Sequence, residues 1–139
     1  MRFMMLYKPG KETNAPPSQQ EIAAMGQLIG DMAKAGVLIA TDGLQHSSKG
    51  ARVKFSGGKR TVIDGPFTET KELIAGFWLW QVRSLEEAIE WVKRCPNPTG
   101  VEAEIEIRQV FEAEDFGAEF TPELRKQEER LRAQMAAKK

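Results

Sequence analysis

The chain has 139 residues, of which 41% are hydrophobic and 29% are charged. This length suits one domain with a single core, and the composition excludes wholesale disorder. Twenty Lys and Arg balance twenty Asp and Glu, so the zero net charge argues against nucleic acid or an anionic membrane as a partner. No apolar run reaches the roughly 18 residues of a membrane helix, and the chain turns polar at Lys8, too early for a signal peptide. We therefore expect a cytoplasmic protein.

The chain contains one cysteine, Cys95, and one histidine, His46. A single cysteine cannot form an internal disulfide, and these two residues are too few for a Cys/His zinc site. The sequence also contains no glycine-rich phosphate loop and no nucleophile with a recognisable base. We predict no metal centre and no cofactor.

The first third of the chain predicts a strand, a helix and a second strand. Residues 2–8 form a short apolar run of strand character, and a Pro- and Gly-rich loop follows them. Ser18 and Glu21 have the spacing of a capping box, which predicts a helix that ends at Gly36, before a strand over residues 37–41. The residues expected on the buried side of this helix are Ile22, Met25, Ile29 and Met32.

The middle of the chain predicts a β-hairpin. Residues 51–55 and 60–63 favour strands, and Ser56-Gly-Gly-Lys59 between them supplies the residues of a tight turn. A further strand is expected over residues 74–82.

A second helix and a last strand complete the expected domain. Ser84 begins another capping box, and Pro96 ends its helix before a strand over residues 102–110. The inward side chains of this helix are expected to be Leu85, Ala88, Ile89 and Val92. The element order predicts an α+β fold, a ferredoxin-like β-α-β-β-β-α-β sandwich with an extra hairpin strand. Thr121-Pro122 then begins a separate C-terminal helix.

The strand over residues 74–82 is apolar on both faces, with Phe77 and Leu79 on one and Trp78 and Trp80 on the other. Two helices can cover only one face of a sheet. An uncovered face that carries two Trp side chains would be a large apolar patch. We therefore expect a homodimer that buries the Trp-bearing face.

One long motif resembles a known family. The stretch Val62-Ile-Asp-Gly-Pro-Phe-Thr-Glu-Thr-Lys-Glu72, followed by Gly76-Phe77, resembles the signature of DGPF-type proteins in the YCII-related family. Further resemblance lies in Gly43-Leu-Gln, Leu85-Glu-Glu-Ala-Ile-Glu-Trp91 and Glu106-Ile-Arg108. The resemblance covers residues 1–111, where we expect the YCII-related domain, and leaves a linker and helix over residues 112–139.

The resemblance implies a domain that dimerises face to face into a dimeric α+β barrel, with a cleft between sheet and loops. The wider family includes a dehydrochlorinase that acts on a chlorinated hydroxyquinol, and it resembles muconolactone isomerases in fold. In YCII proteins a His-Asp pair is the proposed acid–base couple, with the histidine near the start of the first helix. This chain has no histidine between Ser18 and Gly36, so only Asp64 is carried over, by its place in the motif.

Asp64 has two interpretations. At a sheet edge beside Trp78 or Trp80, desolvation would favour its protonated form and suit a general acid or base. Alternatively, its carboxylate caps the N–H groups of the turn over residues 65–67. Because Asp-Gly is an ordinary turn dipeptide, we favour the structural role.

The other candidate site residues are Lys71, Glu69, Tyr7 and Trp78 for binding, and His46 for catalysis. Lys71 would stabilise a carboxylate or an enolate, whereas a solvated charged turn is the alternative for Lys71 and Glu69. Tyr7 would donate a phenolic hydrogen bond into the cleft, or else lie in the core. His46 ionises near neutral pH, although a lone loop histidine is more often solvated.

Two functions remain open at this point. The first is a homodimeric module that binds or senses a small molecule in an interfacial cleft. The alternative is an isomerase or lyase that moves a proton on a small carbonyl or phenolic compound, with Asp64 as acid–base group. Since no motif carries a defined reaction, we favour the binding module.

Overall fold

The computed structural model describes residues 1–13, 15–69, 72–96 and 102–137. The chain folds into two compact units, Met1–Gln109 and Val110–Lys139. Within the described residues, no helix has the length and apolarity needed to cross a membrane.

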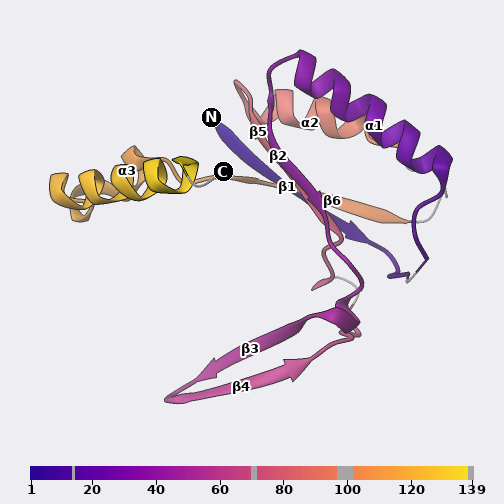
Figure 1. The fold of residues 1–139 in the computed structure, drawn as a ribbon, viewed down its shortest axis with the longest axis horizontal. Coiled ribbons are helices and arrows are strands. Elements are labelled where there is room, and N and C mark those ends of the chain that lie inside the picture. Colours follow the sequence, from indigo (N-terminus) through magenta and orange to yellow (C-terminus); the bar gives the residue numbers. More distant parts are fainter. Residues whose placement is uncertain (14, 70–71, 97–101, 138–139) are drawn as a thin grey trace. The chain divides into compact units, whose positions relative to one another are not determined.

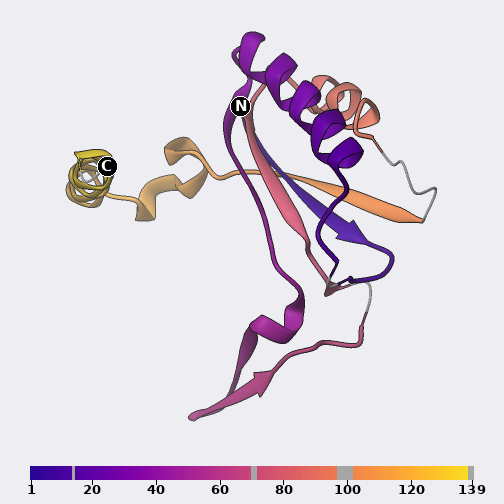
Figure 2. The ribbon, with the colours of Figure 1, turned by 45° about the vertical axis from the view of Figure 1, so that its right-hand side comes forward.

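The first unit is built on a four-stranded sheet. Its strands are β1 (Arg2–Pro9), β2 (Leu38–Gly43), β5 (Gly76–Gln81) and β6 (Ala103–Gln109). They follow the order β2-β5-β1-β6, and every neighbouring pair is antiparallel. Helices α1 (Gln19–Lys34) and α2 (Leu85–Lys93) lie next to each other on one face of this sheet (Figures 1 and 2). This arrangement confirms the predicted ferredoxin-like α+β fold, and the sheet within one chain is open rather than closed into a barrel.

Both helices begin and end where the sequence predicts. The Ser18 hydroxyl accepts the Glu21 N–H at 3.1 Å, and the Ser84 hydroxyl accepts the Glu87 N–H at 3.2 Å. Gly36 follows α1 with a φ of 73°, a left-handed conformation that costs glycine little. The local capping chemistry is therefore sufficient to place the helix ends.

The inward sides of the helices differ in part from the predicted ones. Ile22 of α1 is 58% exposed, and Leu85 and Ile89 of α2 are also exposed, although all three were expected inside. The helix residues that pack into the core are Met25, Leu28, Met32, Ala88, Trp91 and Val92. Helical spacing allows several neighbouring stripes, and docking on the sheet selects one of them.

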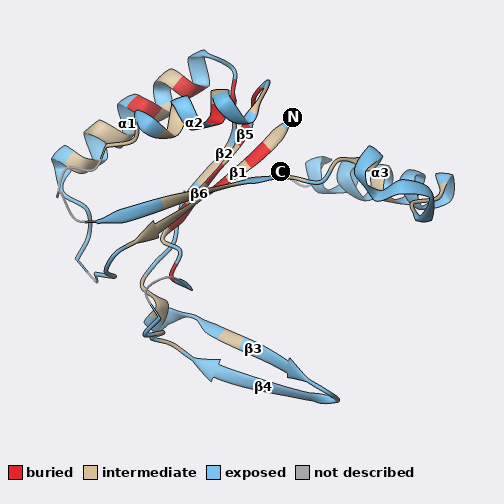
Figure 3. Cartoon of the chain, turned by 180° about the vertical axis from the view of Figure 1, so that it is seen from behind, coloured by how far each residue is buried: buried red, intermediate tan, exposed pale blue. Residues whose placement is uncertain are grey.

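The covered face of the sheet, which lies against α1 and α2, carries the core. Phe3 and Met5 of β1 are buried here, together with Trp78 and Trp80 of β5, whose ring centroids lie 5.9 Å apart. Figure 3 shows that the buried residues gather where the helices meet the strands. The expectation of an uncovered Trp-bearing face, and of a dimer formed through it, is therefore wrong. Alternation along β5 directs both Trp side chains toward the helices.

The open face of the sheet, opposite the helices, has an apolar centre made by half-buried Met4, Leu6, Phe77 and Leu79. The register between β1 and β5 places these four side chains in one contiguous group. This group, rather than the Trp pair, is what the helices of the unit leave uncovered.

The predicted hairpin forms, but it does not join the four-stranded sheet. Strands β3 (Ala51–Ser56) and β4 (Lys59–Asp64) pair only with each other, in a two-stranded sheet. The hairpin projects beyond one end of the larger sheet (Figures 1 and 2). A short 3-10 helix, η1 (Ser47–Lys49), immediately precedes it.

The second unit contains a 3-10 segment, η3 (Ala113–Glu119), and helix α3 (Pro122–Ala137). The predicted cap of α3 is present, because the Leu124 N–H donates to Thr121 Oγ1 at 3.3 Å. No residue of α3 is buried in the described structure. Before the helix, the Phe111 and Phe116 rings are stacked with centroids 4.9 Å apart, and the Phe120 ring is tilted against Phe116.

Candidate functional site

Polar side chains from two loops meet beside the base of the hairpin. We name Glu12, His46, Ser47 and Ser48 the polar loop cluster. Glu12 comes from the loop after β1, and the other three come from the segment between β2 and β3. The side chains of His46 and Glu12 are mostly covered by these loops, since only 18% and 14% of their surfaces are exposed.

Glu12 and Ser47 form the centre of the cluster. The Ser47 backbone N–H donates to Glu12 Oε1 at 2.9 Å, and the Ser47 hydroxyl donates to Glu12 Oε2 at 2.6 Å. The hydroxyl bond, then the backbone bond and the nearby His46, hold the pKa of the Glu12 carboxyl below its usual range. A carboxylate stabilised in this way is a weak base, so the geometry suits loop fixation better than proton abstraction.

His46 caps η1 with its ring. The Ser48 backbone N–H donates to His46 Nδ1 at 3.1 Å, and Ser48 Oγ lies 3.0 Å from the same nitrogen. Because Nδ1 accepts, the proton of the neutral ring is on Nε2, which lies 3.6 Å from Glu12 Oε2. The lone pair that a general base would use is therefore already bound to Ser48.

The cluster also anchors the Asp-Gly-Pro-Phe motif. The Phe67 N–H donates to Ser47 Oγ, and the Gly65 N–H donates to the Gly50 carbonyl, both at 3.0 Å. A Cβ on Gly65 would overlap the Ser47 carbonyl oxygen, so this position requires glycine for close backbone approach. Ser47 thus links the loop after β1, the η1 segment and the motif.

The structure corrects the interpretation of Asp64. The N–H groups that its side chain was expected to cap are bound by Ser47 and Gly50. The Asp64 side chain is exposed at the end of β4 and forms no hydrogen bond or ion pair with any described residue. The capping prediction is wrong because Ser47 takes that role. Exposure also leaves Asp64 without the desolvation on which its acid–base role depends.

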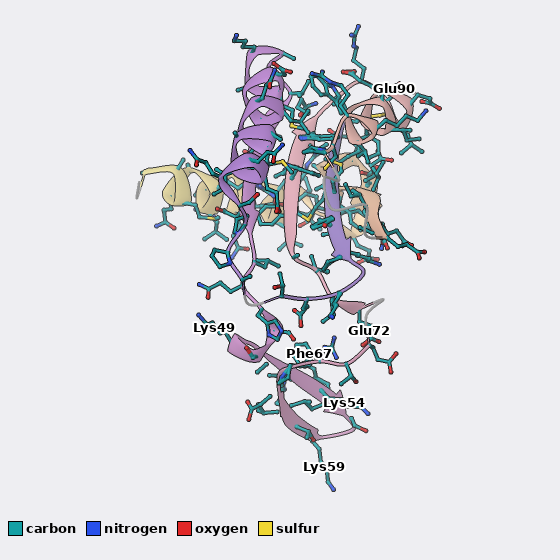
Figure 4. All side chains as sticks on the ribbon, turned by 90° about the vertical axis from the view of Figure 1, so that its right-hand side faces the viewer. Lys49, Lys54, Lys59, Phe67, Glu72 and Glu90 are labelled. Carbon is teal, nitrogen blue, oxygen red and sulfur yellow. The ribbon has the colours of Figure 1, made fainter. Side chains whose placement is uncertain are left out.

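The other motif residues lie near the base of the hairpin. Glu69 is exposed, and its carbonyl accepts the Glu72 N–H at 3.0 Å, whereas Lys71 lies outside the described residues. Arg52 bridges the hairpin to the motif, since its guanidinium lies 3.7 Å from the Phe67 ring centroid and 3.4 Å from Glu72 Oε2. Figure 4 shows Phe67 and Glu72 at this base, with Lys54 and Lys59 further along the hairpin.

Tyr7 and Trp78 lie on the covered face of the sheet. Trp78 is 5% exposed and packs in the core, which leaves little of its ring for a ligand. Tyr7 is half-buried, and burial, followed by the nearby Cys95 and Glu21, raises the pKa of its phenol. Tyr7 therefore stays a neutral hydroxyl, able to donate or accept a hydrogen bond at the border of the core.

The comparisons with known proteins place the chain in a family. The model of the YCII-related domain matches residues 1–114. The chain belongs to the YCII-related family. An uncharacterised protein of Rhizobium meliloti (strain 1021) is 30% identical to this YCII-related chain over 108 residues, which cover 76% of the chain and 87% of that protein. Neither description states an activity, so the chemistry rests on the residues themselves.

In this YCII-related protein, the histidine does not pair with the motif aspartate. No hydrogen bond or ion pair in the described part of the chain joins His46 to Asp64, and His46 instead faces Glu12. Sequence reasoning missed Glu12 because it stands in a Pro- and Gly-rich loop, distant in sequence from its partner Ser47. No spacing rule connects two such loops, so only the fold brings them together.

The open face offers a second candidate surface in this YCII-related chain. Beside its apolar centre, Lys8 Nζ lies 2.6 Å from Glu106 Oε1, and Arg108 donates to Glu106 Oε2 at 3.1 Å. These cations lower the pKa of the Glu106 carboxyl, Lys8 more than Arg108. Among the described residues, no group of three His, Cys, Asp or Glu side chains is placed to hold a metal ion.

Proposed function

We propose that this YCII-related protein is a homodimeric small-molecule-binding module whose ligand lies between the open faces of two subunits. The observation that carries this proposal is the contiguous apolar centre of the open face, made by Met4, Leu6, Phe77 and Leu79. A sheet face of this kind gains free energy when a second apolar surface covers it. The domain would be residues 1–111, followed by a C-terminal linker and helix.

The expected ligand is a small apolar or aromatic compound with a hydroxyl or carboxylate group. The apolar centre would hold its carbon skeleton, and the charged edge at Lys8, Glu106 and Arg108 would orient its polar group. A binding role is favoured over catalysis because the polar groups of the loop cluster hydrogen-bond to one another. The Glu12 carboxylate and His46 Nδ1 both have partners within the cluster.

Light scattering at micromolar concentration tests the dimer. The wild-type protein should have twice the chain mass of 15.6 kDa. Leu79→Glu should give monomers, because it would place an unpaired charge in an apolar interface, whereas the conservative Leu79→Met should stay dimeric. Wild-type monomers at every concentration would refute the proposal.

Ligand binding is tested by saturation-transfer NMR with a panel of phenols and aromatic carboxylic acids. Compounds of the panel that bind the wild type should also bind Leu79→Met. They should not bind monomeric Leu79→Glu. If bound compounds contact Leu79→Glu equally well, the site does not lie between the subunits.

A second candidate function, proton transfer by an isomerase or lyase, is favoured by one observation. His46 Nε2 faces the Glu12 carboxylate at 3.6 Å, which is the arrangement of a histidine oriented by an acidic group. Exchange of acidic C–H protons for deuterium in the same panel, followed by NMR, tests this function. Exchange that the wild type catalyses and His46→Gln does not would favour the enzyme.

A further inference from the structure

His46 caps η1 with an acceptor that a proton can remove. Its Nδ1 accepts the Ser48 N–H at 3.1 Å, and its backbone takes the N-cap position of η1. Helix caps are usually oxygens of Ser, Thr, Asn or Asp, which stay acceptors near neutral pH. Histidine is the side chain that changes charge between about pH 5 and 8, and its charged ring has no acceptor. The cap of η1 therefore depends on pH in a range where other caps do not.

One charged group faces the His46 ring in the described structure. It is Glu12, from the loop after β1, whose Oε2 lies 3.6 Å from His46 Nε2. On η1 itself, the Lys49 ammonium is bonded to a neighbouring amide side chain. Asp64 and Arg52, from the two strands at the hairpin base, form no ion pair with His46. The charge of the ring therefore acts on the cap at one nitrogen and on Glu12 at the other.

Protonation of the ring would exchange one contact for another. A proton on Nδ1 would point at the Ser48 N–H, so two donors would face each other and the cap would be lost. The Ser48 hydroxyl, 3.0 Å from Nδ1, is placed to accept this proton. At the other nitrogen the ring gains an ion pair, because the bonds from Ser47 hold the pKa of Glu12 low and keep it ionised. The charged ring thus binds Glu12 more strongly and η1 less.

The turn of η1 is packed tightly against the motif. The Phe67 N–H donates to Ser47 Oγ, and the Gly65 N–H donates to the Gly50 carbonyl, both at 3.0 Å. The backbones approach so closely that a Cβ on Gly65 would overlap the Ser47 carbonyl oxygen. Because close-packed groups transmit displacement, a change of the turn at Ser48 is passed to the hairpin base.

We propose that His46 is a pH-sensitive switch at the base of the hairpin β3–β4. The neutral ring caps η1 and keeps the base packed. The protonated ring pairs with Glu12, releases the Ser48 N–H and loosens the base as pH falls from about 8 to 5. The switch lies within a single chain, so it goes beyond the proposed binding function and does not depend on the homodimer.

Titration by NMR tests the switch directly, because His46 is the only histidine of the chain. Its ring should give one titrating set of signals between about pH 8 and 5. The amide signals of Ser48, Gly65 and Phe67 should shift with the same midpoint as the ring. Protection of the Gly65 and Phe67 N–H groups from hydrogen exchange, corrected for the intrinsic effect of pH, should fall roughly fivefold, as expected for the loss of one helix cap.

Two substitutions at His46 hold the base in one state each. His46→Asn places an acceptor oxygen where the ring has Nδ1 and takes up no proton, so it keeps the cap at every pH. His46→Gln extends a polar group toward Glu12 but has no acceptor at the Nδ1 position. At about pH 5, His46→Asn should protect Gly65 and Phe67 as the wild type does at about pH 8. At about pH 8, His46→Gln should show the weaker protection of the wild type at about pH 5.

Three results would overturn the switch. The first is a His46 ring that does not titrate between about pH 8 and 5. The second is a ring that titrates while the amides of Ser48, Gly65 and Phe67 keep their shifts and their protection. The third is a pH dependence in His46→Asn equal to that of the wild type, which would assign the change to another group.

The same titration separates the switch from the proposed homodimer. Leu79→Glu alters the open face and not the polar loop cluster, so its monomers should titrate as the wild type does. A monomeric wild type with the expected titration refutes the homodimer and supports the switch. A dimeric wild type whose amides at the hairpin base do not respond to pH supports the homodimer and overturns the switch.

Discussion

Strand β5 and the hairpin β3–β4 have the same alternation of side chains but opposite burial. Trp80 of β5 is fully buried, whereas Phe55 of the hairpin is 65% exposed. Helices α1 and α2 cover the Trp side of β5, while the hairpin strands pair only with each other. Alternation thus indicates which residues share a face, and the surrounding elements decide whether that face is core or surface.

The contrast between β5 and the hairpin would be contradicted if truncating Trp80 and truncating Phe55 had similar effects on the free energy of unfolding. Trp80→Ala should lower the free energy of unfolding by about 3–5 kcal/mol, because it empties a fully buried site in the core. Phe55→Ala should cost less than about 0.5 kcal/mol per chain, when measured by urea denaturation of a monomeric background such as Leu79→Glu. A large loss for Phe55→Ala in monomers would show that the hairpin packs within its own chain.

A second test concerns the base of the hairpin, where the backbone approach is closest. Gly65→Ala should cost about 1–3 kcal/mol, because the added Cβ forces the Ser47 carbonyl to move. Gly58→Ala in the hairpin turn is the matched control, since nothing lies within 4 Å of its Cβ position. Equal melting temperatures for the two variants would contradict the close packing at Gly65.

The polar loop cluster should make stability depend on pH. Because the folded state lowers the pKa of Glu12, its contribution is present above the unfolded value near 4.5 and is lost as pH falls through the folded pKa. The difference in unfolding free energy between wild type and Glu12→Gln should therefore narrow in acid. A difference that stays constant from neutral pH to strong acid would mean that Glu12 is not held as described.

Ser47→Ala should lower the free energy of unfolding by about 1–2 kcal/mol at neutral pH, because the Phe67 N–H loses its acceptor.

The smallest effect is expected at Asp64, at the exposed end of the hairpin. Asp64→Ala should change the free energy of unfolding by less than about 0.5 kcal/mol, since the side chain has no partner among the described residues. Chemical denaturation of Asp64→Ala and Ser47→Ala under the same conditions compares their free energies of unfolding. A cost for Asp64→Ala as large as that of Ser47→Ala would restore the capping role to Asp64.

The helix ends were predictable because capping is local chemistry. Ser18 and Ser84 bond to N–H groups three residues away, so the chain segment itself contains the signal. The buried sides of the helices were less predictable, as exposed Ile22 and Leu85 show. Their burial depends on which side meets the sheet, and that choice is not local.

The candidate site shows the same limit. The motif that contains Asp64 is bonded to the polar loop cluster, because the Phe67 N–H donates to Ser47 Oγ, and His46 contacts the neighbouring Ser48. The sequence nevertheless assigned the capping role to Asp64 and gave no role to Glu12. The bond between Glu12 and Ser47 joins two loops that are separated by a whole helix and a strand.

The sequence by itself determined the element order, the helix caps, the hairpin and the family, because each depends on neighbouring residues or on one uninterrupted motif. Only the tertiary structure decided which face of β5 is covered, where the hairpin stands and which groups meet around Ser47. The reason is physical: an alternating strand is compatible with cover on either side. The packing of distant segments selects one side, and that selection is a property of the whole fold.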